Sequence, residues 1–480
     1  MKILIASDTY YPSVNGASYF TQRLATVLAK RGHEVFVFAP GGSFKDSISS
    51  HDGVTVYGIR SIRIPIYPNF RVSPLFLARK AIKKYIQGIR PDVIHIQNHF
   101  MIGKGVVLAA NELNIPIMGT NHFMPENLVH YFHLPKFMEN RLKRFGWSQF
   151  VEIYKRLGII TTPTKTAARL IENLGLGKEV IPVSCGIDLE RFSSKKNGEY
   201  LKKRFNIPKE RLILLYVGRL DKEKRIELII SALPQIVKHV EAHLVIAGMG
   251  KLKISLETLA QKVGVRDRVT FTGFVPDEDL PNLYRIADLF VIAGIAELQS
   301  IVTMEAMASG LPVIAINAMA LPELVHDEEN GYLFADGDSR MLAGHAVKIL
   351  SDRTLWEQMA QRSLQIIQAH DINKILDKYE LLYRQTITQR AFAPQHQLTT
   401  SMSKWGWAWR QFIKPVVISG LSVMCAVVSI FFAIDYKKTG SFKASSKHLV
   451  MEVYAEVFTE ENHDGMHHFE HYREENFRSR

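Results

Sequence analysis

The chain has 480 residues, a formal net charge of +13 and 47% hydrophobic residues. This length exceeds what one hydrophobic core normally serves, so we expect two domains with additional segments. The positive charge favours an anionic partner, such as a phosphorylated substrate, an anionic lipid or a nucleic acid. The two cysteines, Cys185 and Cys425, imply no disulfide framework and are typical of a reducing compartment.

The first part of the chain alternates short apolar runs with helical patterns, which predicts a doubly wound α/β domain. Residues 2–6 form a buried strand that is too short for a signal peptide, so we expect the body of the protein in the cytosol. Gly16 precedes the next helix. It either lets backbone amides approach a substrate or phosphate, or is an ordinary turn glycine. No G-x-G-x-x-G run accompanies it, which argues against dinucleotide binding.

Three histidines, His95, His99 and His122, fall at or near the carboxyl ends of predicted strands, where ligand sites gather in such sheets. A metal site is one interpretation, although their spacing matches no known ligand pattern. Residues 136–147 interleave cations with Phe, Met, Leu and Trp at helical spacing. This segment is either an amphipathic helix that lies on an anionic membrane or a helix packed on its own domain. No nucleic-acid motif accompanies the charge, so nucleic acid is a weaker interpretation.

A second α/β domain begins after a hinge near residues 183–192. There a strand at 212–217 leads into Gly218, Arg219 and then Lys224. Two fixed cations beside such a loop can stabilise the charge that grows on a leaving diphosphate without any proton transfer. A solvated basic loop is the alternative interpretation.

The stretch Glu297–Ala315 predicts a strand, an acidic loop, a helix over 300–308, a stop at Gly310 and a further strand. The helix N-terminus at Ser300 and Ile301 offers amide groups to an anion. Two carboxylates eight residues apart, Glu297 and Glu305, suit hydroxyl groups such as those of a sugar and a ribose. The combination favours a nucleotide-sugar, whereas two solvated surface glutamates are the alternative.

This stretch resembles the signature of the family-4 retaining glycosyltransferases, in which two glutamates eight apart precede A-x-G-x-P-V-I-A. The match through Met304–Ala315 is close, and the resemblance extends over about residues 1–386. It implies two Rossmann-like doubly wound α/β domains that face each other across a cleft, the GT-B fold. One departure stands out, because most members carry a Gly-Phe-Gly-like run where this chain has residues 298–300, Leu-Gln-Ser. The departure leaves open which backbone amides meet the phosphates.

The resemblance also implies roles for individual residues. Arg219 and Lys224 would hold the donor diphosphate, Glu305 the ribose hydroxyls and Glu297 the sugar hydroxyls. His122, in a T-x-H position, would contact the substrate near the reacting carbon. The residues expected to bind the donor are Gly16, Gly218, Arg219, Lys224, Phe274 in the loop that faces the nucleobase, Glu297, Ser300, Ile301 and Glu305. No metal and no cofactor are expected, because the UDP- or GDP-linked sugar is itself a substrate.

Residues 415–434 carry no charge and are long enough to span a bilayer, although a buried core helix is the alternative. Three tryptophans in residues 405–409 suit a membrane interface, and flanking lysines leave the orientation of the span undecided. The expected segments are an acceptor-side domain 1–182, a donor domain 183–370, a helix 371–388 that crosses back, a linker 389–414, the span 415–434 and a polar tail 435–480.

The sequence therefore predicts a retaining hexosyltransferase with cytoplasmic catalytic domains and one membrane span. Its expected acceptor is a membrane lipid, namely diacylglycerol, phosphatidylinositol or a glycolipid, at an anionic membrane surface. In this it resembles lipid-directed members such as the diacylglycerol glucosyltransferases and phosphatidylinositol mannosyltransferases. A soluble or polysaccharide acceptor, a non-catalytic sugar-binding protein and a sugar-nucleotide epimerase are the alternatives.

Overall fold

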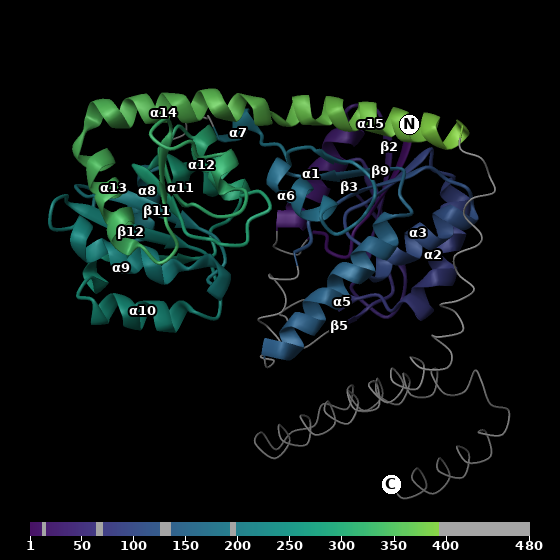
Figure 1. The fold of residues 1–480 in the computed structure, drawn as a ribbon, viewed down its shortest axis with the longest axis horizontal. Coiled ribbons are helices and arrows are strands. Elements are labelled where there is room, and N and C mark those ends of the chain that lie inside the picture. The colour runs from purple at the N-terminus through teal and green to yellow at the C-terminus, as the bar shows by residue number, and fades with distance from the viewer. Residues whose placement is uncertain (12–15, 64–70, 125–135, 193–197, 393–480) are drawn as a thin grey trace, which may run out of the picture. The chain divides into compact units, whose positions relative to one another are not determined.

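The computed structural model describes residues 1–11, 16–63, 71–124, 136–192 and 198–392 (Figure 1). These residues form two large sheets, each with helices from its own part of the chain. The two-domain α/β architecture predicted from the sequence is therefore confirmed. The predicted span 415–434 lies outside the described residues and stays a prediction. Within the described part, no helix is both long and apolar enough to cross a membrane.

The first sheet has the strand order β10-β9-β8-β7-β1-β2-β4-β3. Its strands are β1 (Lys2–Ala6), β2 (Glu34–Pro40), β3 (Ser47–His51), β4 (Val54–Ile59), β7 (Val93–Ile96), β8 (Ile117–Thr120), β9 (Ile159–Thr162) and β10 (Val180–Pro182). All neighbours are parallel except β3 and β4, which pair antiparallel at the edge. The central strands are almost wholly apolar because helices cover both faces of a parallel sheet, whereas the edge strand β3 is exposed along its length.

The helices of this domain are α1 (Gly16–Lys30), α2 (Leu75–Ile89), α3 (Met101–Glu112), α5 (Lys136–Tyr154) and α6 (Lys165–Glu172). A short antiparallel pair, β5 (Ile62–Arg63) with β6 (Arg71–Val72), stands apart from the main sheet. Apolar residues at helical spacing explain how these helices cover the sheet. In α2, for example, Ala78, Ile82, Ile86 and Ile89 are all buried, while the lysines and arginines of the same helix are not.

The second sheet has the strand order β13-β12-β11-β14-β15-β16 and is parallel throughout. Its strands are β11 (Leu212–Val217), β12 (Ala242–Ala247), β13 (Val269–Gly273), β14 (Leu289–Ile292), β15 (Val313–Ile316) and β16 (Gly331–Phe334). Its helices are α7 (Leu189–Phe192), α8 (Glu199–Arg204), α9 (Ile226–Ile236), α10 (Lys253–Lys262), α11 (Leu280–Arg285), α12 (Ile301–Ala308), α13 (Ser339–Ser351) and α14 (Arg353–Ile367).

In both sheets the chain reverses its direction of winding between two neighbouring strands. These switch points are β1/β7 in the first sheet and β11/β14 in the second. Loops leave such a pair of strands in opposite directions and open a crevice at their carboxyl ends, where ligands bind in doubly wound folds. We therefore expect ligand-binding residues in the loops that follow β1, β7, β11 and β14.

The last helix, α15 (Ile372–Phe392), follows the second domain along the chain but contacts strands β7 and β8 of the first sheet. The Tyr383 hydroxyl lies 2.9 Å from His95 Nδ1, and His95 Nε2 lies 2.7 Å from Thr120 Oγ1. Arg31, which directly follows α1, adds ion pairs to Asp377 and Glu380. A buried polar network thus attaches α15 to the first sheet.

The metal-site interpretation of the three histidines is not supported by this arrangement. His95 is satisfied by Tyr383 and Thr120, and the His99 ring is enclosed by Phe100, Phe123 and Phe150. In the part of the chain that the structure describes, there is no group of three or more His, Cys, Asp or Glu side chains that could hold a metal ion.

Burial keeps several histidines neutral in the folded chain. It lowers the pKa of His95 to about 3 and those of His99 and His243 to about 4, from an ordinary value of 6.5. The unfolded chain protonates these rings below pH 6.5, so unfolding takes up protons and the folded state loses stability as the pH falls. Burial also raises the pKa of Asp8 to about 6 and that of Glu305 to about 7, which acts in the opposite direction.

We expect His99→Phe to stabilise the fold selectively at acidic pH. The substitution keeps a ring among aromatic neighbours and removes one group that is protonated on unfolding. The free energy of unfolding of the variant minus that of the wild type should be about 1.4 kcal/mol more positive at pH 5.5 than at pH 8. Urea unfolding followed by circular dichroism at both pH values measures this gain. His51→Phe, at an exposed position of β3, is the control, and equal shifts at the two pH values for His99→Phe would contradict the expectation.

Candidate active site

The two loops at the switch point of the second sheet meet in an ion pair. Lys224 follows β11 and Glu297 follows β14, and their side chains approach to 2.6 Å between Lys224 Nζ and Glu297 Oε1. Both side chains are largely buried, with relative exposures of 18% and 13%. Two residues that are 73 apart in the chain and were selected from the sequence are thus brought into direct contact.

The loop after β11 fixes the position of Arg219. Gly218 has φ +154°, close to the limit of the region that favours glycine, and a Cβ added there would lie 2.8 Å from the Tyr216 hydroxyl. That hydroxyl donates to the Arg219 carbonyl oxygen at 3.0 Å. The Arg219 guanidinium pairs with Asp221 at 2.6 Å and with Glu223 at 2.9 Å. Two carboxylates of the same loop therefore hold the Arg219 guanidinium in place.

Helix α12 begins at Ile301 with Ser300 as its N-cap. The Ser300 hydroxyl accepts a hydrogen bond from the Thr303 amide at 3.3 Å, which ends the preceding loop and starts the helix. The first-turn amides of a helix have no partner within it and favour an anion. A Cβ added at Gly16, the first residue of α1, would lie 3.7 Å from Ile301 Cδ1. The N-termini of α1 and α12 therefore lie side by side.

Glu305 is a buried residue, with only 9% of its surface exposed, and not the solvated surface glutamate of the alternative interpretation. It lies about one turn inside α12, which begins at Ile301. Its Oε2 accepts a hydrogen bond from the Tyr284 hydroxyl at 2.8 Å. Burial raises the pKa of Glu305 to about 7, while Tyr284 and the charge of Arg23 act to lower it.

His122 lies at the carboxyl end of β8 in the first domain. Its Nε2 is 3.0 Å from Gln97 Oε1, and its ring lies against Phe20 with 4.8 Å between centroids. Burial lowers the pKa of His122 to about 4, so the ring is neutral at pH 7. A neutral ring can exchange a hydrogen bond with a ligand but brings no positive charge. Phe274, at the end of β13, is 48% exposed and presents its ring to solvent.

Three residues of this arrangement have no signal in the sequence. Tyr284 comes from α11, Arg23 from α1 and Gln97 from the end of β7. Tyr284 bonds to Glu305, the charge of Arg23 acts on Glu305, and Gln97 bonds to His122, all as a result of tertiary packing. The only clue to Gln97 is its place immediately after a strand at the switch point β1/β7.

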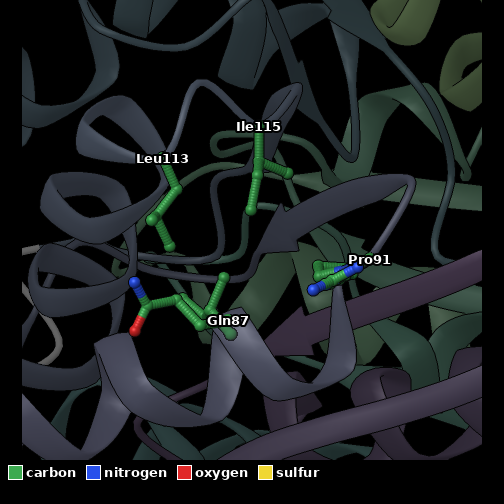
Figure 2. A pocket seen from close by; sticks show the side chains of 6 residues that line it. Gln87, Pro91, Leu113 and Ile115 are labelled. Carbon is green, nitrogen blue, oxygen red and sulfur yellow. The ribbon is translucent and has the colours of Figure 1, made fainter.

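A shallow cavity elsewhere on the first domain is not part of this arrangement (Figure 2). Ile86, Gln87, Arg90, Pro91, Leu113 and Ile115 line it. Pro91 and Ile115 precede strands β7 and β8, so the cavity lies at the amino ends of these strands. The residues selected from the sequence lie at the carboxyl ends.

The two halves of the chain match two family descriptions. Residues 14–191 match "Glycosyltransferase Family 4", and residues 198–365 match "Glycosyl transferases group 1". The chain is 27% identical over 389 residues to an alpha-monoglucosyldiacylglycerol synthase of Streptococcus pneumoniae, covering 79% of this chain and 86% of the relative. It is 28% identical over 371 residues to a GDP-mannose-dependent alpha-mannosyltransferase of Mycolicibacterium smegmatis, covering 76% and 92%.

Solved structures with similar architecture include HepE of Anabaena in complex with UDP-glucose. The two align with a TM-score of 0.63 and 18% identity, covering 81% of this chain and all of HepE. At this identity the likeness is one of fold. It confirms two Rossmann-like domains in the GT-B arrangement.

We expect Tyr284→Phe to destabilise the fold, and to do so more at pH 8 than at pH 5.5. The variant removes the hydrogen bond to a buried carboxylate, which should lower the free energy of unfolding by about 1–3 kcal/mol where Glu305 is ionised. Below the pKa of Glu305, near 7, the protonated carboxyl needs this donor less. Urea unfolding at both pH values measures the loss. Tyr11→Phe, at an exposed tyrosine, is the control. A larger loss at pH 5.5 would refute the expectation.

Proposed function

Because the chain belongs to the family-4 glycosyltransferases of the GT-B fold, enzymes that use nucleotide sugars, we propose a donor, an acceptor and a reaction for it. The observation that carries the proposal is the contact between Lys224 and Glu297 beside the N-terminus of α12. A cation, a carboxylate and the first-turn amides of α12 come together at this switch point. These groups suit a ligand with both phosphate and hydroxyl groups.

In the proposed complex, the donor diphosphate binds to Arg219, Lys224 and the first amides of α12 from Ile301 onward. The ribose hydroxyls donate to Glu305, whose carboxylate the Tyr284 hydroxyl holds in place. The sugar hydroxyls bind Glu297 from the same loop. The nucleobase lies toward Phe274 at the end of β13, where an exposed ring can pack against it. Either a UDP- or a GDP-linked sugar fits these contacts.

The proposed reaction proceeds with retention of configuration. The acceptor hydroxyl oxygen bonds to the anomeric carbon as the bond from that carbon to the β-phosphate oxygen breaks. The departing phosphate takes the proton of the acceptor hydroxyl, so the products are the glycoside and the nucleoside diphosphate. Arg219, Lys224 and the helix amides stabilise the negative charge that grows on the leaving group. Glu297 already bonds to Lys224, which supports a binding role and not that of a nucleophile. His122 contacts the sugar as a neutral donor or acceptor.

A membrane lipid is the proposed acceptor, and helix α5 supports it. Its first turns expose apolar side chains at Phe137, Met138 and Phe145, with exposures of 65%, 42% and 61%. Arg141 and Arg144 of the same segment are exposed as well. Trp147 instead packs inward against Phe123 and Phe150, so α5 combines a packed second half with an exposed basic and apolar first half. Such a surface binds anionic lipid.

Diacylglycerol is the favoured lipid, because the pneumococcal relative is named for a glucosyldiacylglycerol product. A mannosyl donor is the second candidate, favoured by the GDP-mannose-dependent relative. A soluble or polysaccharide acceptor remains the alternative to a lipid. Attachment through residues 415–434, with the catalytic domains on the cytoplasmic side, stays part of this proposal.

We expect membranes that carry the protein to transfer radiolabelled sugar from one of UDP-glucose, UDP-galactose or GDP-mannose into lipid. Lys224→Ala should lower the rate by about 100-fold or more, because it removes a cation that stabilises the leaving group. Glu305→Ala should raise the donor KM at least about tenfold, because it removes hydrogen bonds to a charged group. Scintillation counting of lipid extracts measures both effects.

Lys222→Ala is the matched control, since Lys222 lies in the same turn as Lys224 with its side chain exposed. It should keep the wild-type rate. Label that appears only in water-soluble products would exclude the lipid acceptor but keep the transferase. If Lys224→Ala kept full activity, the proposed donor site would be refuted.

The α5 surface should determine how the rate depends on the membrane. We expect Phe137→Ser/Phe145→Ser to lower transfer into diacylglycerol in phosphatidylglycerol-rich vesicles by about tenfold or more, because two exposed rings no longer enter the bilayer. Transfer to a short-chain diacylglycerol dissolved in detergent should be unchanged. Ile254→Ser, at a residue of α10 that is 78% exposed, is the control. Equal losses in vesicles and in detergent would point to a folding defect and count against the membrane surface.

A further inference from the structure

Gln299 connects the loop before α12 to the segment where the chain leaves the first domain. Its Oε1 accepts a hydrogen bond from the Cys185 amide at 2.7 Å, and its Nε2 donates to the Ser184 hydroxyl at 3.1 Å. The side chain is buried, with 9% exposed. Residues 183–187 follow β10 of the first sheet and lead to the second, and we call them the hinge segment.

The hinge segment is also where the returning chain passes. The Ser184 hydroxyl lies 2.8 Å from His370 Nδ1, and His370 lies two residues before the first residue of α15, Ile372. The Ile187 amide donates to the His370 carbonyl at 2.8 Å, and the Ile372 amide donates to the Ile187 carbonyl at 3.0 Å. The hinge segment, where the chain leaves the first domain, is thus hydrogen-bonded to the segment through which the chain returns. Gln299 contacts the hinge segment through Ser184 and Cys185.

The neighbours of Gln299 have contacts of their own. Leu298 accepts a hydrogen bond at its carbonyl from Thr164 Oγ1, the N-cap of α6 in the first domain, at 2.9 Å. Its side chain packs with Met124 and Ala167 of the same domain. Ser300 caps α12. In the run that replaces the expected glycine-rich sequence, Leu298 therefore holds the loop to the first domain and Gln299 holds it to the hinge segment, while Ser300 starts α12.

From these contacts we propose that Gln299 is a positioning residue that couples donor binding at α12 to the hinge segment. This proposal rests on the proposed function, because the amides that Gln299 positions are those assigned to the donor diphosphate. A glycine at this place has no side chain to bond Ser184 or Cys185. When Gln299 forms its hydrogen bonds to the hinge segment, they hold the loop before α12 in the geometry that binds the donor. Without Gln299, a smaller fraction of molecules is competent, and the apparent donor affinity falls by that fraction.

Cys185 provides a reporter of the hinge that does not depend on activity. Its side chain is 4% exposed, and its amide donates to Gln299. The chain has two cysteines, so Cys425→Ser leaves Cys185 as the single thiol. The rate at which an uncharged thiol reagent labels Cys185 in the full-length protein then measures how often the hinge segment opens.

In the Cys425→Ser protein, we expect Gln299→Met to increase the labelling rate of Cys185 about tenfold. UDP-glucose, UDP-galactose and GDP-mannose are added in turn, and the one that is turned over should slow labelling in the parent and have much less effect in the variant. The donor KM should rise about tenfold, while kcat at saturating donor stays within about threefold. Methionine has a similar length and flexibility but makes neither hydrogen bond.

Three further variants separate positioning from packing. Gln299→Glu keeps an acceptor for the Cys185 amide and should restore part of the donor affinity. Ser184→Ala and Gln299→Met should raise the donor KM by less together than the product of their separate effects, because both remove the Gln299–Ser184 hydrogen bond, whereas only Ser184→Ala also removes the bond to His370. Gln261→Met, at an exposed glutamine of α10, should change nothing.

A Gln299→Met protein that unfolds at lower temperature but keeps the parental KM and labelling rate would overturn the proposal. If the parent transfers sugar and its donor slows the labelling of Cys185, but Gln299→Met behaves identically, the role of Gln299 is refuted and the proposed function is kept. If no nucleotide sugar protects the parent or is turned over, the proposed function fails and the coupling with it.

Discussion

The chemistry of this protein depends on the pairing of β11 with β14 as adjacent parallel strands. The register, with Leu214 opposite Leu289 and Leu215 opposite Phe290, aligns the ends from which the two loops depart. Because side chains alternate along a strand and loops begin where strands stop, a shift by one residue would separate Lys224 from Glu297. The four central residues of β11 and all four residues of β14 are buried, so a shift would also move core residues into polar surroundings. Packing thus holds the polar site in register.

Much of this arrangement could be predicted from the sequence, because the relevant signals are local. Apolar runs followed by glycine loops mark parallel strands, and their order places Arg219, Lys224 and Glu297 at one edge of a sheet. The N-cap at Ser300 follows from its hydroxyl and from the helical residues after it. The two-domain α/β fold could be predicted from such repeated local patterns, because they can be recognised without knowledge of the tertiary structure.

The remainder required tertiary information. Nothing in the pattern of α11 or α1 indicates that Tyr284 or Arg23 approaches Glu305, since both are selected by the packing of distant helices. The burial of Glu305 could not be predicted because one glutamate in a helix is usually solvated. The histidines show that position alone does not define a site. Their common place at strand ends left a metal site as one interpretation, whereas His95 bonds to Tyr383 of α15 and the His99 ring lies among aromatic side chains. Gln299 was visible as a departure from the family sequence, but its partners were not.

The return of α15 to the first sheet has a consequence for how the chain folds as it is made. Tyr379 and Tyr383 are fully buried and complete the surroundings of His95 and Thr120, yet they are synthesised after the whole second domain. Until they emerge from the ribosome, the first sheet has an uncovered apolar and polar surface at β7 and β8. The amino-terminal domain therefore cannot finish folding before the carboxyl-terminal one is made, in contrast to the domain-by-domain order that most multidomain chains follow. The last helix completes the first sheet only after the second domain has been made.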